Sequence, residues 1–453
     1  MLGSNQTPRY SSSRQRYSPR TSQAGTLSEG HSVKSMEVVI EGNCYVSGRL
    51  ERCCVGIENG KIAKIAKTLE GDKEYHFGSK LILPGAIDAH VHFRDPGMIQ
   101  KEDFATGSLA ALYGGVTCVF DMPNTRPPTT TVAAMRDKKK IASAKSMVDF
   151  GLFAGVRPGM DVAGLAKEAI GFKLYMASTT GELLVPSLQT IKGEISAIAG
   201  TRKVLAVHAE DESLRRKEIE KDLEDHLRNR SNECERIAIR KVKEAAKGCR
   251  LHICHVSAKS SIPLIQRVPD LTSEVTPQHI ILDVSSRLGK LAKINPPLRK
   301  REDRHALFQA LKDGTFDIIA SDHAPHTIDE KHEDFDYAPT GMPGVETMVP
   351  MMLQHVKDKH LELSGFVRML CERPGEIYGV RKGKIAVGYD ADLMVVDTSA
   401  GTVIRADDLH SKCGWTAFEG APAIFPHAVF LRGQLMIENG GQVGERAGRD
   451  VVV

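Results

Sequence analysis

The chain has no long apolar run and no paired-cysteine motif, and both absences narrow the class of protein. No stretch of its 453 residues is long and apolar enough to span a bilayer, and no secretory leader is recognisable. None of the nine cysteines has Cys-x-x-Cys spacing, and the adjacent Cys53 and Cys54 are poorly placed for an ordinary disulfide. We therefore expect reduced thiols in a cytoplasmic enzyme that does not bind a membrane.

A strong net charge is also missing, which argues against a nucleic-acid partner. The formal net charge is +4, and basic runs such as residues 138–140 and 215–217 stand among acidic neighbours, as on solvated helix faces. Residues 1–28 contain no Asp or Glu, and their Ser/Arg-rich composition cannot form a core. We expect residues 1–35 to be a disordered leader: an expression remnant, a transit peptide, or the product of a mis-assigned start that belongs at Met36.

Apolar runs alternate with amphipathic, charged stretches across residues 84–380. Segments such as residues 231–248 have the pattern of helices. The eight apolar runs that we expect to be strands are residues 86–93, 117–122, 148–156, 171–176, 204–208, 252–256, 272–282 and 316–320. This alternation predicts an α/β protein with a (β/α)8 TIM-type barrel. An open doubly wound sheet is the alternative, but no Gly-x-Gly-x-x-Gly motif follows the first strand.

The two parts of the chain that flank the barrel have a different sequence pattern, which indicates short strands and glycine-rich turns. The expected strands are residues 37–40, 54–57, 61–65 and 80–83 on one side, and 383–397, 423–425 and 429–431 on the other. We expect residues 36–83 and 381–453 to form one small β-sandwich domain, built from both chain ends beside the barrel.

The most informative stretch is Asp-Ala-His-Val-His-Phe-Arg-Asp-Pro-Gly at residues 88–97. His90 and His92 are two residues apart at the end of an apolar run. In a strand both imidazoles therefore point to one face and can reach one ion. A buried pair of hydrogen-bonded histidines is the structural alternative. Arg94 follows two residues later, where it can bind a substrate anion beside the metal.

Other polar residues fall at the predicted ends of further barrel strands. Catalytic residues of such barrels lie at the C-terminal ends of the strands, which meet at one mouth. We expect this mouth to hold His90, His92, Arg94, Asn124, Lys173, His208, His255, Asp322 and His326. A buried pair of metals there would make a bridging hydroxide nucleophilic near neutral pH, and imidazole ligands suit zinc best.

Lys173 is the unusual member, because it interrupts the apolar run of residues 171–176. A buried lysine costs several kcal/mol unless it is neutral, paired or modified. It can be a lysine whose ammonium reaches solvent, or carbon dioxide can convert it to a carbamate that bridges two cations. Asp322 can serve as metal ligand and proton shuttle. Its structural alternative is a helix N-cap.

Six motifs resemble those of dihydroorotases in the cyclic amidohydrolase superfamily. They are His-Val-His-Phe-Arg-Asp-Pro-Gly (90–97), Met-Pro-Asn-Thr (122–125), Gly-Phe-Lys-Leu-Tyr-Met (171–176), Asn-Pro-Pro-Leu-Arg (295–299), Ser-Asp-His-Ala-Pro-His (321–326) and Gly-Met-Pro-Gly-Val-Glu-Thr (341–347). The resemblance runs from about Val38 to Leu435. It implies reversible cyclisation of N-carbamoyl-L-aspartate to dihydroorotate and water, in pyrimidine synthesis. Lys173 places the chain with the class I branch, in which a carboxylated lysine bridges two zinc ions.

The same resemblance implies roles for the remaining residues. Arg94, Asn124 and His326 match residues that bind the substrate α-carboxylate, and Asn295 matches one that contacts the ring. Residues 177–181 match a loop that closes over the pocket. The family also implies a homo-oligomer and, in some members, association with aspartate transcarbamoylase.

One departure from the family pattern, one possible extra metal site and three alternative functions remain open. Many relatives have His-His where this chain has Gln278 and His279, and Cys254 and Glu274 resemble positions that hold an extra zinc in some relatives. Allantoinases and dihydropyrimidinases share the metal site but act on rings without a carboxylate. On such rings Arg94 would have no anionic group to bind. Some superfamily members have lost their metals and act as scaffolds, but all six proposed ligands are present here: His90, His92, Lys173, His208, His255 and Asp322.

Overall fold

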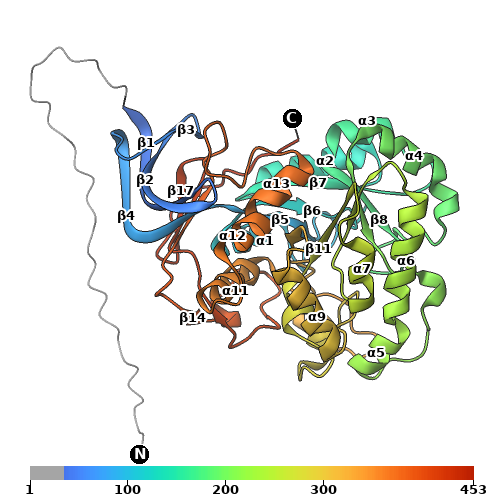
Figure 1. Ribbon diagram of the computed structural model, residues 1–453. Coiled ribbons are helices and arrows are strands. Elements are labelled where there is room, and N and C mark those ends of the chain that lie inside the picture. Colours follow the sequence, from blue (N-terminus) through green and yellow to red (C-terminus); the bar gives the residue numbers. More distant parts are fainter. Residues whose placement is uncertain (1–34, 453) are drawn as a thin grey trace, which may run out of the picture.

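Eight parallel strands form a barrel at the centre of the molecule, as the computed structural model of residues 35–452 shows (Figure 1). Each strand pairs in parallel with the next one along the chain. The strands are β5 (Ala86–Val91), β6 (Val116–Asp121), β7 (Asp149–Gly155), β8 (Gly171–Tyr175), β9 (Val204–His208), β10 (Arg250–Ile253), β11 (Leu271–Val275) and β12 (Ile318–Ile319). A parallel bridge between Val91 and His323 joins the last strand to the first. The predicted (β/α)8 barrel is confirmed, whereas the predicted leader, except for Ser35, lies outside the described residues.

Two of the expected barrel strands are much shorter than the apolar runs suggested. The run at residues 272–282 is divided: β11 ends at Val275, and residues 277–281 form a helix. Pro277 explains the division, because its fixed φ suits the first turn of a helix and it has no N–H to give to a sheet. The run at residues 316–320 contributes only Ile318 and Ile319 to β12.

Helices follow the strands and pack around the outside of the barrel (Figure 1). They are α1 (Phe104–Tyr113), α2 (Val132–Lys145), α3 (Val162–Glu168), α4 (Lys192–Thr201), α5 (Leu223–Asn229), α6 (Asn232–Ala245), α7 (Ile262–Ile265), α8 (Pro277–Ile281), α9 (Arg301–Lys312), α10 (Ile328–His332), α11 (Val345–Lys357), α12 (Leu363–Val367) and α13 (Arg373–Tyr378). Helix α6 shows why they form. Its buried Cys234, Ala238, Ile239 and Val242 repeat every three to four residues, and mainly charged residues occupy the other face.

The two chain ends meet in a second sheet of eight strands. Its order is β18 (Gly441–Gln442), β17 (Gln434–Glu438), β16 (Ala428–Leu431), β13 (Leu393–Val396), β4 (Gly71–Pro84), β1 (Met36–Val46), β2 (Arg49–Glu58) and β3 (Lys61–Ala66). Strand β4 is the junction, since it pairs in parallel with β1 and antiparallel with β13. The predicted β unit from both ends is confirmed, and its strands are hydrogen-bonded as one continuous sheet that has its own apolar core.

Part of the C-terminal prediction needs correction. Of residues 383–397 only Leu393–Val396 form a strand, and residues 423–425 do not join the second sheet. Instead β15 (Pro422–Ala423) pairs with β14 (Thr402–Val403) in a separate two-stranded ribbon. The domain boundaries after residues 35, 83 and 380 stay predictions.

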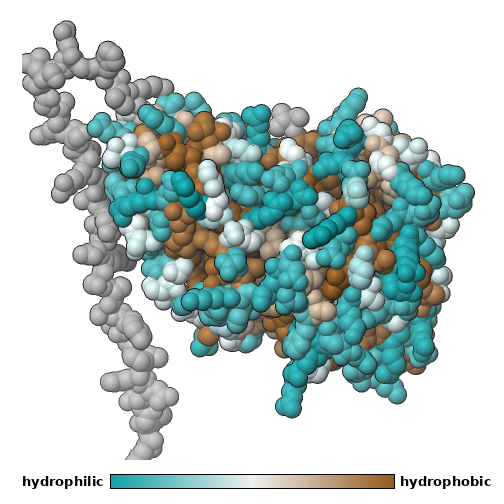
Figure 2. Space-filling view, in the orientation of Figure 1, coloured by the Kyte–Doolittle hydropathy of each residue, from teal (hydrophilic) through white to brown (hydrophobic). Residues whose placement is uncertain are grey.

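Most of the visible surface is hydrophilic, and hydrophobic side chains appear on it in scattered patches (Figure 2). The barrel core contains the large buried side chains of Phe104, Phe150 and Phe172. Within residues 35–452, no helix is long and apolar enough to cross a membrane.

Candidate active site

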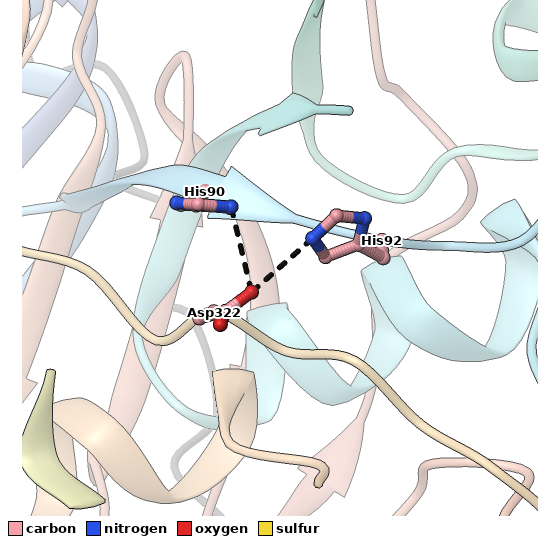
Figure 3. Close-up of side chains that lie close together, drawn as sticks. All are labelled: His90, His92 and Asp322. Carbon is pink, nitrogen blue, oxygen red and sulfur yellow. Dashed lines mark ion pairs between the residues drawn. The ribbon is translucent and has the colours of Figure 1, made fainter. Parts of the chain in front are cut away.

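His90, His92 and Asp322 lie together at the mouth of the barrel. His90 belongs to β5, His92 follows that strand, and Asp322 follows β12. Oδ1 of Asp322 is 3.4 Å from Nε2 of His90 and 3.2 Å from Nε2 of His92 (Figure 3). One ligand atom from each residue lies within 4.8 Å of the other two, which is close enough to hold one metal ion.

Hydrogen bonds at the opposite ring nitrogens orient these two histidines. Nδ1 of His90 lies 2.5 Å from a carboxylate oxygen of Glu274, and Nδ1 of His92 lies 2.6 Å from Oδ1 of Asn124. Both oxygens accept, so each Nδ1 carries the proton and each Nε2 presents its lone pair toward Asp322. A partner of this kind, which fixes the tautomer, is typical of metal-bound histidines.

Lys173, His208 and His255 complete the cluster from β8, β9 and the end of β10. Nδ1 of His208 is 3.0 Å from Nε2 of His255. Nζ of Lys173 is 3.5 Å from Nε2 of His90 and 2.9 Å from Sγ of Cys254. The side chain of Lys173 is fully buried, so the structure does not support a lysine that reaches solvent.

The donor set of this cluster fits metal ions. Burial lowers the pKa values of His90, His92, His208 and His255, and neutral imidazole is the form that binds a metal. Nδ1 of His255 is buried without a hydrogen-bond partner among the described residues. Four neutral imidazoles beside a carboxylate and a buried amine are a set that zinc accepts.

Three residues of the mouth have strained backbone. The φ angles of Arg94, His255 and Asp322 are 61°, 35° and 47°, in the region that favours glycine. Such conformations cost on the order of 1–3 kcal/mol each and concentrate at functional sites. The strain places these side chains at the ends of their strands, where they face the mouth.

A pocket of about 370 Å³ opens over the cluster, which suits a small molecule. Its lining contains nine of the sequence-predicted residues: His90, His92, Arg94, Asn124, Lys173, His208, His255, Asn295 and Asp322. Of the predicted residues, His326 alone lies outside the lining. It is buried behind Arg94, with its Nε2 atom 3.3 Å from Nη2 of Arg94.

Arg94 and Lys173 are the two basic side chains among the residues that line this pocket. The side chain of Arg94 is buried, and its Nε donates to the carbonyl of Pro325 at 3.2 Å. Its Nη1 has no hydrogen-bond partner among the described residues. A buried guanidinium with a free donor is a ready site for an anion.

The pocket also contains residues for which no individual role was predicted. They are Tyr175, Thr179, Thr180, Ala324, Thr340 and Gly341. Tyr175 had a usable signal, because it lies two positions after Lys173 in a strand and therefore shares its face. Thr180 belongs to the loop predicted to close over the pocket, and its carbonyl accepts from Nδ2 of Asn124 at 2.9 Å.

Glu274 has a role that the sequence did not reveal. Besides His90, it accepts from Nε2 of His252 at 3.1 Å and from the amide of His255 at 3.1 Å. It also lies with His90 and Cys254 in a group whose ligand atoms are within 4.8 Å of one another. Its hydrogen bonds to the histidines give it an orienting role that needs no extra metal.

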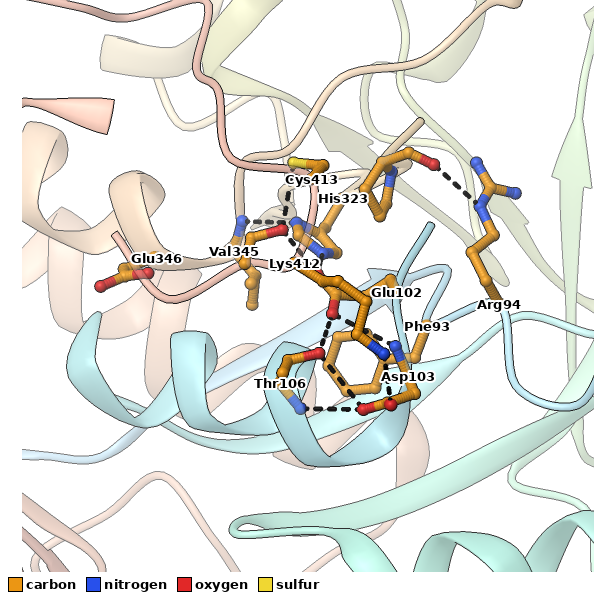
Figure 4. A network of polar contacts seen from close by, with 12 residues as sticks. Phe93, Arg94, Glu102, Asp103, Thr106, His323, Val345, Glu346, Lys412 and Cys413 are labelled. Atoms are coloured by element: carbon orange, nitrogen blue, oxygen red, sulfur yellow. Dashed lines mark hydrogen bonds and ion pairs between the residues drawn. The ribbon is translucent and has the colours of Figure 1, made fainter. Parts of the chain in front are cut away.

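A polar network lies on the other side of the mouth, between the barrel and the C-terminal segment (Figure 4). Nδ1 of His323 accepts from the amides of Gly344 and Val345 at 3.1 and 3.4 Å, at the start of α11. Nε2 of His323 faces Oε2 of Glu102 at 3.4 Å, and Glu102 also accepts from Ser411. The network fixes the backbone that immediately follows Asp322.

The chain is similar to curated archaeal dihydroorotases over most of its length. A dihydroorotase from Methanosarcina mazei is 39% identical over 422 residues, which cover 86% of this chain and 92% of that protein. A dihydroorotase from Thermoplasma volcanium is 38% identical over 412 residues, which cover 90% and 96%.

Solved structures of similar fold include hydantoinases. The L-hydantoinase (dihydropyrimidinase) from Arthrobacter aurescens matches with a TM-score of 0.87 at 30% identity, over 92% of this chain and 99% of that one. A D-hydantoinase matches with a TM-score of 0.85 at 26% identity, over the same shares of the two chains.

The model of the Amidohydrolase family matches residues 81–435, which is most of the chain. Members of this family are generally metal-dependent hydrolases, and the clusters around His90 supply candidate metal sites. Taken with the similarity to dihydroorotases, this match shows that the chain is a hydrolase of the Amidohydrolase family and, within it, a member of the dihydroorotase group.

Proposed function

We propose that this protein is a dihydroorotase, which interconverts N-carbamoyl-L-aspartate and (S)-dihydroorotate plus water in pyrimidine synthesis. The observation that carries the proposal is Arg94, a buried guanidinium that lines the pocket beside the histidine cluster and keeps Nη1 unpaired among the described residues. Dihydroorotate has a ring carboxylate for this cation, whereas allantoin, hydantoin and dihydrouracil have none. The curated relatives named dihydroorotase support the same substrate.

The substrate carboxylate would bind at the Arg94 side of the pocket, away from the ring amide. A planar guanidinium can donate two parallel hydrogen bonds to a carboxylate. Asn124, in the pocket lining, and His326, which lies against Arg94, would be further carboxylate-binding residues, and Asn295 would contact the ring. Nδ2 of Asn295 donates to Thr340 at 3.0 Å, which holds the amide in place at the pocket wall.

The proposed metal site uses the whole cluster. His90 and His92 would hold one zinc ion, His208 and His255 the other, and a carbamate on Lys173 would bridge them, with Asp322 as a further ligand. When bound, two such ions polarise the amide carbonyl and lower the pKa of water so that it can attack near neutral pH.

Asp322 moves the proton in this scheme. Its Oδ1 is directed toward the two Nε2 atoms of His90 and His92, beside the proposed metal site. The carboxylate accepts a proton from the attacking water and donates it to the amide nitrogen that leaves.

Turnover of dihydroorotate by the purified protein tests the function directly. We expect hydrolysis of dihydroorotate that a metal chelator abolishes and zinc restores, and no comparable turnover of allantoin, hydantoin or dihydrouracil. Turnover of a neutral ring instead would favour the hydantoinase-like alternative, which the solved structures make the second candidate. Failure to turn over any ring with zinc supplied would favour a scaffold.

The variant Lys173→Ala tests whether a carbamate on Lys173 bridges the two metal ions. Activity should collapse, and short carboxylic acids should restore part of it because they can replace the bridging group. The intact protein kept under carbon dioxide should show the added mass of the carbamate on Lys173. Absence of that mass from an active, zinc-loaded protein would rule out the bridging lysine.

The proposal also includes a homo-oligomer in the cytoplasm, with aspartate transcarbamoylase as a partner enzyme. It rests on the resemblance to the family. Light scattering of the purified protein gives the oligomeric state. Co-purification with the tagged protein from its own cells tests the partner.

A further inference from the structure

Lys101 and Glu330 lie behind Arg94 and have no role in the scheme above. The side chain of Lys101 is 11% exposed, and its Nζ lies 3.1 Å from Nδ1 of His326 and 2.8 Å from Oε1 of Glu330. His326 in turn lies against Arg94. These four side chains form a line, Glu330–Lys101–His326–Arg94, that ends at the pocket.

The partners of His326 determine which of its nitrogens carries the proton. An ammonium has three donors and no acceptor, so Nδ1 of His326 must accept from Lys101. On the other side of the ring, Nε2 lies 3.2 Å from the carbonyl oxygen of Thr340, which can only accept. Both partners require the proton on Nε2.

Burial and the neighbouring cations keep the ring of His326 neutral. Burial lowers the pKa of His326 to about 3, and the nearby cations Arg94, Lys101 and Lys331 act in the same direction, against Glu330. At neutral pH the ring therefore has one proton, and the ammonium of Lys101 helps to hold it on Nε2.

The position of this proton matters for Arg94. Nε2 of His326 and Nη2 of Arg94 are 3.3 Å apart, and both are donors, so neither satisfies the other. The Nε2–H of His326 is directed to the carbonyl of Thr340, so the N–H groups of Nη2 of Arg94 are left for an anion. With the proton on Nδ1 instead, the lone pair of Nε2 would accept from Arg94 and use one of the donors meant for the substrate.

We propose that Lys101 is a positioning residue for carboxylate recognition. By donating to Nδ1 of His326 it keeps the proton on Nε2, and so keeps the guanidinium of Arg94 available for the carboxylate of the substrate. Glu330 balances the charge of Lys101. The inference deepens the proposed function and rests on it for the identity of the carboxylate.

Lys101→Met tests the role through KM. Without the ammonium, Oε2 of Glu330, 3.6 Å from Nδ1 of His326, becomes the partner that attracts the proton. We expect KM for dihydroorotate to rise about tenfold at pH 8, the usual effect of losing a charge-assisted hydrogen bond, with little change in kcat.

The pH dependence separates this role from a structural one. Removal of Lys101 leaves Glu330 uncompensated and raises the pKa of His326. As the pH is lowered toward 6, the ring in the variant takes a second proton and Nε2–H returns. The ratio of the variant KM to the wild-type KM should therefore fall with pH, whereas a loosened pocket would give a constant ratio.

Three further variants control the experiment. Lys101→Gln, and Glu330→Gln in the Lys101→Met background, each supply an amide donor near Nδ1 and should restore part of the wild-type KM. Lys139→Met is the matched control: Lys139 of α2 is 15% exposed, and its Nζ lies 3.0 Å from Glu168 of α3 and 2.7 Å from Asp450. It should leave KM unchanged.

Two measurements decide the inference even if the proposed reaction is wrong. Ring ¹⁵N shifts of His326, assigned with a His326→Gln variant, should show Nε2–H in the wild type and Nδ1–H in Lys101→Met. Orotate should bind Lys101→Met about tenfold more weakly than wild type, and uracil should show no difference. A wild-type proton on Nδ1, equal orotate binding, or wild-type protein that does not bind orotate would overturn the role of Lys101.

Discussion

At the scale of single residues, the site depends on which nitrogen of each histidine carries a proton. Glu274 and Asn124 accept from His90 and His92, so the opposite nitrogens face Asp322 as lone pairs. His208 follows the same rule, since its Nε2 faces Oε2 of Glu210 at 2.9 Å and Nδ1 is left for the cluster. Metal affinity should therefore depend on these oxygen acceptors as well as on the imidazoles.

Asp322→Asn should separate metal binding from proton transfer. The amide keeps the shape and one oxygen of the carboxylate but cannot accept the proton, so kcat should fall by roughly 10²–10⁴-fold. Elemental analysis should find most of the zinc retained. A variant that keeps the wild-type kcat would exclude the shuttle.

The variant Glu220→Gln should change how the free energy of unfolding depends on pH in the acid range. Burial alone would raise the pKa of Glu220, but hydrogen bonds from His226, Asn229 and Lys293 outweigh it and hold the pKa at about 2. Because the pKa in the folded state is lower than in the unfolded state, this carboxylate stabilises the fold above about pH 4.5, and the stabilisation is lost as the pH falls toward 2.

Urea denaturation at several pH values checks the Glu220 prediction. The unfolding free energy of Glu220→Gln should be lower than that of the wild type by about 3 kcal/mol at pH 7. The difference should shrink below pH 4.5. A difference that stays constant from pH 7 to pH 3.5 would contradict the assignment.

At the scale of elements, one lysine connects the barrel to the second sheet. Nζ of Lys382 lies 2.6 Å from both Asp149, at the start of β7, and Asp392, just before β13, and 3.0 Å from Asp390. The three carboxylates are close enough to hold a cation, and the ammonium of Lys382 fills that place.

Lys382→Met should destabilise the protein strongly. It leaves buried carboxylates without their shared cation, which typically costs about 3–5 kcal/mol of unfolding free energy. Denaturant titration measures the loss. Adding Asp149→Asn and Asp392→Asn should recover part of it, and failure of the triple variant to recover would show that packing rather than charge is responsible.

Element prediction from the sequence succeeded where the apolar pattern was local. The barrel strands and α6 have periodic apolar residues within the segment itself, and the metal-ligand candidates follow directly from the strand ends. The run at residues 272–282 failed because its pattern does not show where Pro277 begins a helix. Glu274 and Lys101 could not be assigned, because their roles depend on contacts with segments far away in the chain.

At the scale of the whole molecule, metal binding should stabilise the folded state in addition to its part in the reaction. The proposed ligands come from five different places on the barrel, so ions bound there tie β5, β8, β9, β10 and the end of β12 together. A ligand that binds only the folded state raises stability by about 2.7 kcal/mol at a hundred times its dissociation constant.

Chelation should therefore lower the melting temperature by several degrees, and zinc should restore both the melting temperature and the activity. Calorimetry of the chelated and reloaded protein measures this. His208→Asn is the control, since it should reduce the zinc-dependent shift. An unchanged melting temperature on chelation of an active protein would place the metal away from the barrel strands.

Both sheets are completed by late parts of the chain: β12 and His323 close the barrel against β5, and β13 covers β4. During synthesis, β4 and β5 leave the ribosome long before these partners. Until the partners are made, β4 and β5 each keep an unpaired edge that can pair with another chain. A truncated product that ends just after Asp322 would contain every proposed metal ligand, yet it would lack β13 and be prone to aggregate. The yield of active protein therefore depends on quality control during synthesis as well as on the chemistry of the pocket.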